Sequence, residues 1–165
     1  MNVFFVWLET TSFSMWVRDS PSVFAFPAIL TLHTIGMGLV AGLSAAVDVR
    51  ILGVAAGVPL TEARRFRAFL WFGFWLNAVS GVVLLIGYPT KALTNPLFYV
   101  KLALIAIGVA VQLAIEHRVL RNPNIGVEGM PRTGKILAAV SLVCWAAAIA
   151  AGRFLAYTYS VLTSV

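Results

Sequence analysis

Charged residues are scarce in this sequence. Asp, Glu, Lys and Arg make up 11% of the 165 residues, whereas about 25% is usual for a soluble domain. Hydrophobic residues make up 61%, so the chain has too little polar surface to cover a globule in water. The composition therefore excludes a water-soluble domain and predicts that a lipid bilayer surrounds most of the chain.

Cysteine and the common catalytic motifs are also scarce or absent. The single cysteine, Cys144, lies in an apolar run, which excludes a disulfide framework and a CxxC metal site. The sequence has no HExxH, GxSxG or phosphate-binding-loop motif and no paired carboxylates for acid–base catalysis. It begins without a basic segment or a small-residue cleavage site, so no cleaved signal peptide is expected.

What the sequence does contain is four long apolar runs. They cover residues 23–47, 69–88, 97–115 and 136–157, and a membrane crossing needs about 20 helical residues. The connectors are short, so consecutive helices are expected to run antiparallel. The sequence thus predicts an all-α integral membrane protein, with a four-transmembrane-helix bundle formed by residues 19–165.

Residues 1–18 have a different pattern. One set of side chains recurs there at helical spacing and is mostly apolar: Phe4, Trp7, Leu8, Thr11 and Met15. Glu9, Ser12 and Arg18 lie elsewhere on the wheel. This pattern predicts an N-terminal interfacial amphipathic helix with its tryptophans at headgroup level. A fifth crossing is the alternative, and the charges and hydroxyls of the segment count against it.

Basic residues gather in the connectors that follow the first and third runs. These connectors hold eight Lys and Arg, against two on the opposite side: Arg50, Arg64, Arg65, Arg67, Arg118, Arg121, Arg132 and Lys135, against Arg18 and Lys91. Basic connectors stay in the cytoplasm, so we expect both termini in the periplasm of a bacterial inner membrane. The basic residues behind the net charge of +6 thus have a role in orienting the helices. Nucleic acid is therefore not expected as a partner.

Small residues are frequent in the first and fourth runs, for example Gly36, Gly38 and Gly42 in the first and Ala148 and Gly152 in the last. Small residues let helix backbones approach closely in lipid. We therefore expect these two helices to be in close contact. Similar faces can also bind other membrane subunits or a second copy of the chain.

His33 is the strongest candidate for a functional residue. An ionisable side chain inside a span is costly and is a functional candidate for that reason, and a helical rise of about 1.5 Å per residue places His33 near the midplane. A buried imidazole can bind haem or copper, shuttle protons or bond a neighbouring carbonyl. Met37 shares its helix face, and Cys144 has a similar depth, so these two are candidate additional metal ligands or ordinary packing residues.

Other polar residues could complete a site around His33. Asn77 also lies near the midplane, whereas Lys101 and Arg153 lie near the outer surface. The two cations either extend to the headgroups or form a basic roof over a pocket at His33, where haem propionates or a quinone headgroup would fit. Asn77 would then be a hydrogen-bond partner of the cofactor, or it bonds between helices.

Two polar groups near the cytoplasmic side are assigned surface roles. His117 lies at the cytoplasmic end of the third run, too far from His33 for one copy of the chain to bind a haem through both histidines. Asp48 is the acidic residue nearest an apolar run. It could pair with Arg50, or Arg50 could instead bind lipid phosphates. One such carboxylate is too few for a pump-type relay.

The order of these features resembles an uncharacterised bacterial family of small four-helix inner-membrane proteins. The resemblance covers roughly residues 16–117 and rests on a histidine in the first span, on Asp-x-Arg-x-Leu-Gly at residues 48–53 and on Asn-Pro-x-Phe-x-x-Lys at residues 95–101. That family is distantly similar to HemJ-type protoporphyrinogen oxidases and to CopD-type copper-resistance membrane proteins. The first similarity implies His33 as a haem ligand with Lys101 in the same site, and the second implies copper handling.

The sequence leaves three functions open. The chain could be a haem b-binding, redox-linked protein with His33 as the ligand. It could be a non-catalytic membrane subunit or anchor of a larger complex. It could also be a metal-handling or transport protein that uses His33, Met37 and Cys144.

Overall fold

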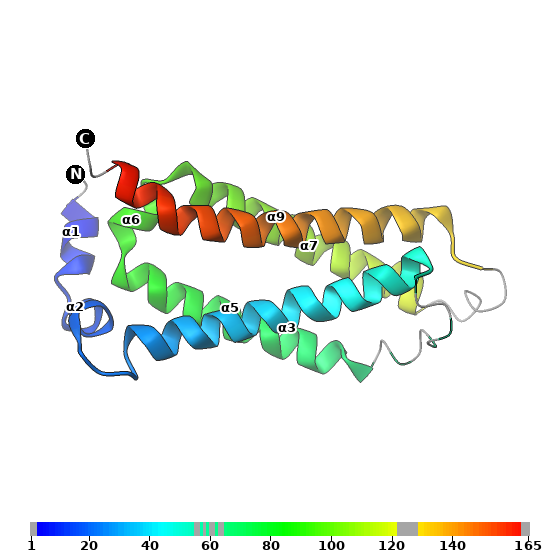
Figure 1. Ribbon diagram of the computed structural model, residues 1–165, viewed down its shortest axis with the longest axis horizontal. Helices are drawn as coiled ribbons and strands as arrows, with labels where there is room; N and C mark the ends of the chain where they lie inside the picture. Colours follow the sequence, from blue (N-terminus) through cyan, green and yellow to red (C-terminus); the bar gives the residue numbers. More distant parts are fainter. Residues whose placement is uncertain are drawn as a thin grey trace.

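Four long helices form the body of the protein (Figure 1). The computed structural model describes residues 3–54, 57, 59, 62, 65–121 and 129–162, which leaves Arg64 and part of the connector after the third span outside the described residues. The long helices are α3 (Phe26–Leu52), α5 (Arg67–Gly87), α7 (Pro96–Ile115) and α9 (Arg132–Leu162). Each is long and apolar enough to cross a membrane. Every regular element among the described residues is helical, which confirms the predicted all-α four-helix bundle.

The helices continue beyond the predicted spans at the end that carries the basic connectors. An apolar window stops at the first charged residues, whereas a helix continues until its backbone is capped. α3 continues through Asp48 and Arg50 and ends at Gly53, whose φ of 100° is the left-handed conformation that suits glycine. α7 is extended by one π-helical turn, η1 (Glu116–Leu120). At the opposite end, the Asn95 side chain caps α7 by accepting a bond from the backbone N–H of Leu97 at 3.0 Å.

The bundle consists of two helix pairs. α5 packs mainly against α3, α7 packs mainly against α9, and contact between α3 and α9 joins the pairs. α3 and α9 therefore touch as predicted, but the small residues of α3 have different roles. Gly36 lies against α5, where a Cβ would be 2.9 Å from the carbonyl oxygen of Gly73. Gly38 and Gly42 have open space around them instead.

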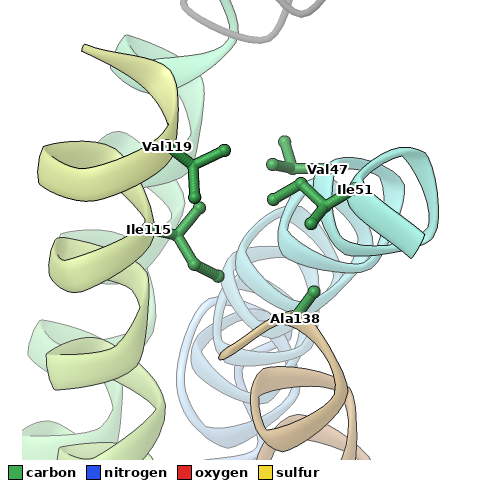
Figure 2. Packing of buried hydrophobic residues seen from close by; sticks show 5 residues of the cluster. All are labelled: Val47, Ile51, Ile115, Val119 and Ala138. Atoms are coloured by element: carbon green, nitrogen blue, oxygen red, sulfur yellow. The ribbon is translucent and has the colours of Figure 1, made fainter. Parts of the chain in front are cut away.

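Two apolar clusters fill the contact between the pairs. One contains Val40, Ala41 and Trp145 and joins α3 to α9 in the middle of the bundle. The other lies toward the basic end, where side chains from α3, α7 and α9 point toward one another (Figure 2). Its members are Val47, Ile51, Ile115, Val119 and Ala138.

The N-terminal segment forms two short helices where one was predicted. α1 (Val3–Glu9) and α2 (Ser12–Asp19) meet at two threonines, whose hydroxyls bond back to the carbonyls of Trp7 and Leu8 at 2.9 and 2.8 Å. Such bonds compete with a continuous helix, and Thr11 then caps α2 by accepting from the backbone N–H of Ser14. The break allows the segment to fold over the end of the bundle (Figure 1).

Specific hydrogen bonds hold this segment on the bundle. The Ser14 hydroxyl donates to the carbonyl of Ile86 in the last turn of α5 at 2.9 Å. Glu9 accepts from the backbone N–H of Thr90 at 3.2 Å, in the short helix α6 (Pro89–Leu93). α1 and α2 therefore cap the end of the bundle at which both termini lie (Figure 1).

Charge is distributed unequally between the two ends of the bundle. The ends of α3 and η1 and the starts of α5 and α9 lie at one end (Figure 1), and the described basic residues of the two connectors lie there with them. Arg18 lies at the opposite end and bonds to Asp19 at 3.0 Å; this hydrogen bond raises the pKa of the Arg18 guanidinium. The described residues thus retain the asymmetry seen in the sequence.

Candidate functional site

The structure brings His33 and Asn77 together between α3 and α5. His33 Nδ1 lies 3.0 Å from the backbone carbonyl oxygen of Asn77 and 3.2 Å from the hydroxyl of Ser80. The carbonyl can only accept, so Nδ1 carries the proton and donates to it. In the neutral imidazole Nε2 is then unprotonated, and its lone pair can bind a metal or accept a proton.

The Asn77 side chain strengthens this arrangement. Its Nδ2 donates to the backbone carbonyl of His33 at 2.8 Å, so each of the two residues bonds to the backbone of the other. Ser80 Oγ donates to the carbonyl of Leu76 at 2.6 Å and keeps its lone pairs for Nδ1. The imidazole is therefore held in one orientation and one tautomer, as is usual for histidines that bind metals.

Glycines on both helices make the contact between α3 and α5 possible. Gly36 of α3 and Gly73 of α5 let the helix backbones approach, and a Cβ at Gly81 of α5 would lie 3.1 Å from Cε1 of His33. His33 and Asn77 were predicted as site residues from the sequence, whereas Ser80 and Gly81 were not. The spacing along α5 points to Gly81, because Gly73, Asn77 and Gly81 repeat every four residues on one face of the helix.

Lys101 belongs to the same half of the bundle as His33. Its ammonium interacts electrostatically with the imidazole, and its stem passes Gly152 of α9, where a Cβ would be 3.6 Å from Cε. The structure therefore combines a neutral imidazole with one nearby cation. Arg153 follows Gly152 but is exposed, and no hydrogen bond or ion pair between described residues joins it to His33, Asn77 or Lys101. Its membership of the site stays a prediction.

The two candidate sulfur ligands are placed differently. Met37 is half-buried one turn after His33 on α3. Cys144 is buried beside Trp145, which packs on Ala41 about two turns along α3 from His33. Among the described residues, no three His, Cys, Asp or Glu side chains are grouped as a metal site. His117 is exposed in η1 at the basic end, so the two histidines lie at different depths as predicted.

Asp48 does not form the predicted pair with Arg50. The Asp48 side chain has 0% of its surface exposed, and neither of its carboxylate oxygens has a hydrogen-bond partner in the described part of the chain. The pair was one of two expected arrangements, and it does not form because Asp48 faces α9 inside the bundle, where Ser141 is its polar neighbour. Asp48 is therefore an interior polar group rather than part of the membrane surface.

A cavity of about 250 Å³ lies between α3, α5 and α7 at the basic end. Arg67 of α5 and Arg121 bind the same oxygen of Glu116, at 2.9 and 3.3 Å. The Glu116 side chain is largely buried, while both arginines are half exposed. Apolar side chains such as Leu43 and Trp71 complete the wall. This cavity could not be predicted from the sequence, because the charged residues that line it come from separate connectors.

Comparisons with known proteins identify no relative. No protein-family model matches the chain, and no curated protein and no solved structure is significantly similar to it.

Proposed function

We propose that the chain is a haem b-binding, redox-linked membrane protein in which Nε2 of His33 is an axial ligand. The observation that supports this most directly is the 3.0 Å bond from Nδ1 to the carbonyl of Asn77. This bond leaves Nε2 as the ligating nitrogen and fixes the orientation of the ring. The family that the sequence resembles is in turn distantly similar to HemJ-type oxidases, and that resemblance would imply the same ligand.

The surrounding residues fit such a cofactor. Lys101 is the charged group that acts on His33, and an ammonium there would bind a haem propionate. Asn77 and Ser80 hold the imidazole and thereby stabilise the ligand geometry. The second axial position would be open, or would be filled by a side chain from another helix or by a histidine of a second copy. Haem, when bound, supplies reversible one-electron exchange at its iron.

An optical spectrum of the detergent-purified protein tests this proposal. Cells with an ample haem supply should yield protein with a Soret band and sharp α and β bands after reduction by dithionite. His33→Ala should lose these bands, while His117→Ala is the matched control and should keep them. A wild-type spectrum without these bands, or bands that survive in His33→Ala, would refute the proposal.

We also propose a bacterial inner-membrane location with both termini in the periplasm. The support is the cluster of basic residues at the end of the bundle opposite the termini, because positive connectors are retained in the cytoplasm. Alkaline phosphatase is active only in the periplasm, so its fusion to the C-terminus should be active and its fusion after Gly53 inactive. The reverse pattern would invert the orientation.

A second candidate function is that of a non-catalytic membrane subunit or anchor. It is favoured by Gly38 and Gly42, which are exposed on α3, and no described atom lies within 4 Å of the position that a Cβ would take on either. Two such glycines four residues apart allow another transmembrane helix to approach closely. Gly38→Leu together with Gly42→Leu should then abolish an assembly seen by crosslinking in native membranes. If the wild-type chain forms no crosslinked assembly, this candidate fails.

A further inference from the structure

Five buried oxygen atoms in the half of the bundle near the basic end have no hydrogen-bond partner among the described residues. They belong to α3, α7 and α9: Ser44 Oγ, Asp48 Oδ1, Asp48 Oδ2, Gln112 Oε1 and Ser141 Oγ. Buried polar groups in proteins are nearly always paired, and the cost of an unpaired one is higher where a bilayer surrounds the helices. Such a group of oxygens therefore indicates a binding role.

The helix register places these oxygens in one layer. The Ser141 hydroxyl lies near enough to Asp48 across α3 and α9 to act on its carboxylate as a donor, although no contact between the two side chains has hydrogen-bond geometry. Ser44 lies one turn before Asp48 on the same face. On α7, Gly108 lies against Trp145, while Ile115 packs with Ala138. α7 and α9 run antiparallel. Gln112 lies between Gly108 and Ile115 on α7, and Ser141 lies between Ala138 and Trp145 on α9, so Gln112 lies opposite Ser141.

Apolar side chains lie on both sides of this layer along the bundle axis. The cluster in Figure 2 lies toward the basic end of the helices, and the cluster of Val40, Ala41 and Trp145 lies on the other side. Gln112 also lines the cavity at the basic end. Ser44, Asp48 and Ser141 have 0% of their surface exposed, and Gln112 has 7%. An unbalanced carboxylate in such surroundings is very costly, so the layer requires one positive charge to be stable with Asp48 ionised.

The chemistry of the layer selects the kind of cation. Carboxylate, hydroxyl and amide oxygens are the ligands of hard cations. One carboxylate balances a single positive charge, which favours a monovalent ion over Mg²⁺ or Ca²⁺. The indole N–H of Trp145 also lacks a partner within the described ranges, but as a donor it cannot bind a cation.

We propose that Asp48, Ser44, Ser141 and Gln112 form a binding site for a dehydrated alkali-metal cation. Gln112 also lines the cavity between α3, α5 and α7, and the ion enters from that side. The site is separate from His33, because Asp48 lies fifteen positions after His33 on α3, which is about 22 Å at a rise of about 1.5 Å per residue. It therefore stands whether or not haem is bound.

Thermal unfolding of the detergent-purified protein tests the site. NaCl or KCl should replace choline chloride at constant ionic strength. An alkali cation at ten times its dissociation constant should raise the unfolding midpoint by about 3–6 °C relative to choline. Asp48→Asn should remove this response, while Asp19→Asn, which changes an exposed carboxylate at the opposite end, should keep it.

Two further measurements keep the test decisive if Asp48→Asn does not fold. Ser141→Ala removes one ligand and should raise the salt concentration needed for the half-maximal response. Wild-type protein should also bind radioactive sodium or a potassium analogue in equilibrium dialysis. The proposal is overturned if neither alkali salt differs from choline and no ion is bound. It is equally overturned if infrared spectra show a protonated Asp48 carboxyl group that sodium and potassium leave unchanged.

Discussion

The contact between α3 and α5 should be sensitive to a single methyl group at Gly36. A Cβ at this position would lie 2.6 Å from the backbone nitrogen of Asn77 and 2.9 Å from the carbonyl oxygen of Gly73. Real Cβ atoms do not approach backbone atoms so closely, and all of these neighbours are main-chain atoms that cannot rotate away. Gly36→Ala therefore requires the two helices to separate.

The expected cost follows from two contributions. Overpacking a tight contact typically costs about 1–3 kcal/mol, and separation of the helices also weakens the hydrogen bonds between His33 and Asn77, each worth about 1 kcal/mol. A cost of about 2–3 kcal/mol is therefore expected. Alanine also has a higher helix propensity than glycine, by at most about 1 kcal/mol. This gain offsets part of the loss from overpacking and weakened hydrogen bonds.

Gly38→Ala is the matched control, because no described atom lies within 4 Å of a Cβ at Gly38. It should leave the free energy of unfolding unchanged or raise it by up to about 1 kcal/mol, because only the helix propensity changes there. Both variants can be unfolded reversibly in mixed micelles by increasing the fraction of SDS, with tryptophan fluorescence as the signal. Equal stability of the two variants would refute the close contact at Gly36.

Three further substitutions test other contacts of the structure. Glu116→Gln should destabilise the protein by about 1–2 kcal/mol, because two arginines lose a shared, largely buried carboxylate, whereas Glu62→Gln in an exposed pair should cost less than about 0.5 kcal/mol in the same unfolding assay. Asn95→Ala should cost about 1.5–2.5 kcal/mol through loss of the α7 cap and of a 2.9 Å bond to α9; an effect no larger than that of exposed Thr94→Ala would contradict this. Ser14→Ala should speed proteolysis within the N-terminal helices, because they lose a bond worth about 1 kcal/mol to α5. An unchanged cleavage rate would show that this bond does not hold them.

The number of helices was predictable from the sequence, but their rotation about their own axes was not. A helix that is apolar on all sides gives no periodic signal for its buried face, and α3 is of this kind. His33 and Asn77 could therefore each be assigned a depth, while their contact could not be predicted. In the structure that contact depends on Gly36 and Gly73, and glycines elsewhere in α3 look identical in sequence but have no close neighbours among the described residues.

The interior residues that could not be singled out from the sequence were mainly polar residues without charge. Ser44, Gln112 and Ser141 are common in membrane helices and do not stand out against an apolar background. Asp48 did stand out, but the direction in which it faces could not be predicted, because α3 has no periodic apolar face. α3 continues past the apolar run to Leu52, and Asp48 faces α9 in the bundle interior instead of the headgroups.

The two polar centres use opposite sides and opposite halves of the same helix. His33 bonds to α5 in the half covered by the N-terminal helices, whereas Asp48 faces α9 in the half near the basic end. At a separation of about 22 Å along α3, neither group can pass a proton or an ion directly to the other. A loss of haem in His33→Ala should therefore leave the response to alkali cations intact, and a loss of that response in Asp48→Asn should leave the haem spectrum intact. If both substitutions removed both properties, the common cause would be disruption of α3 itself, and neither side chain could be assigned a ligand from that experiment.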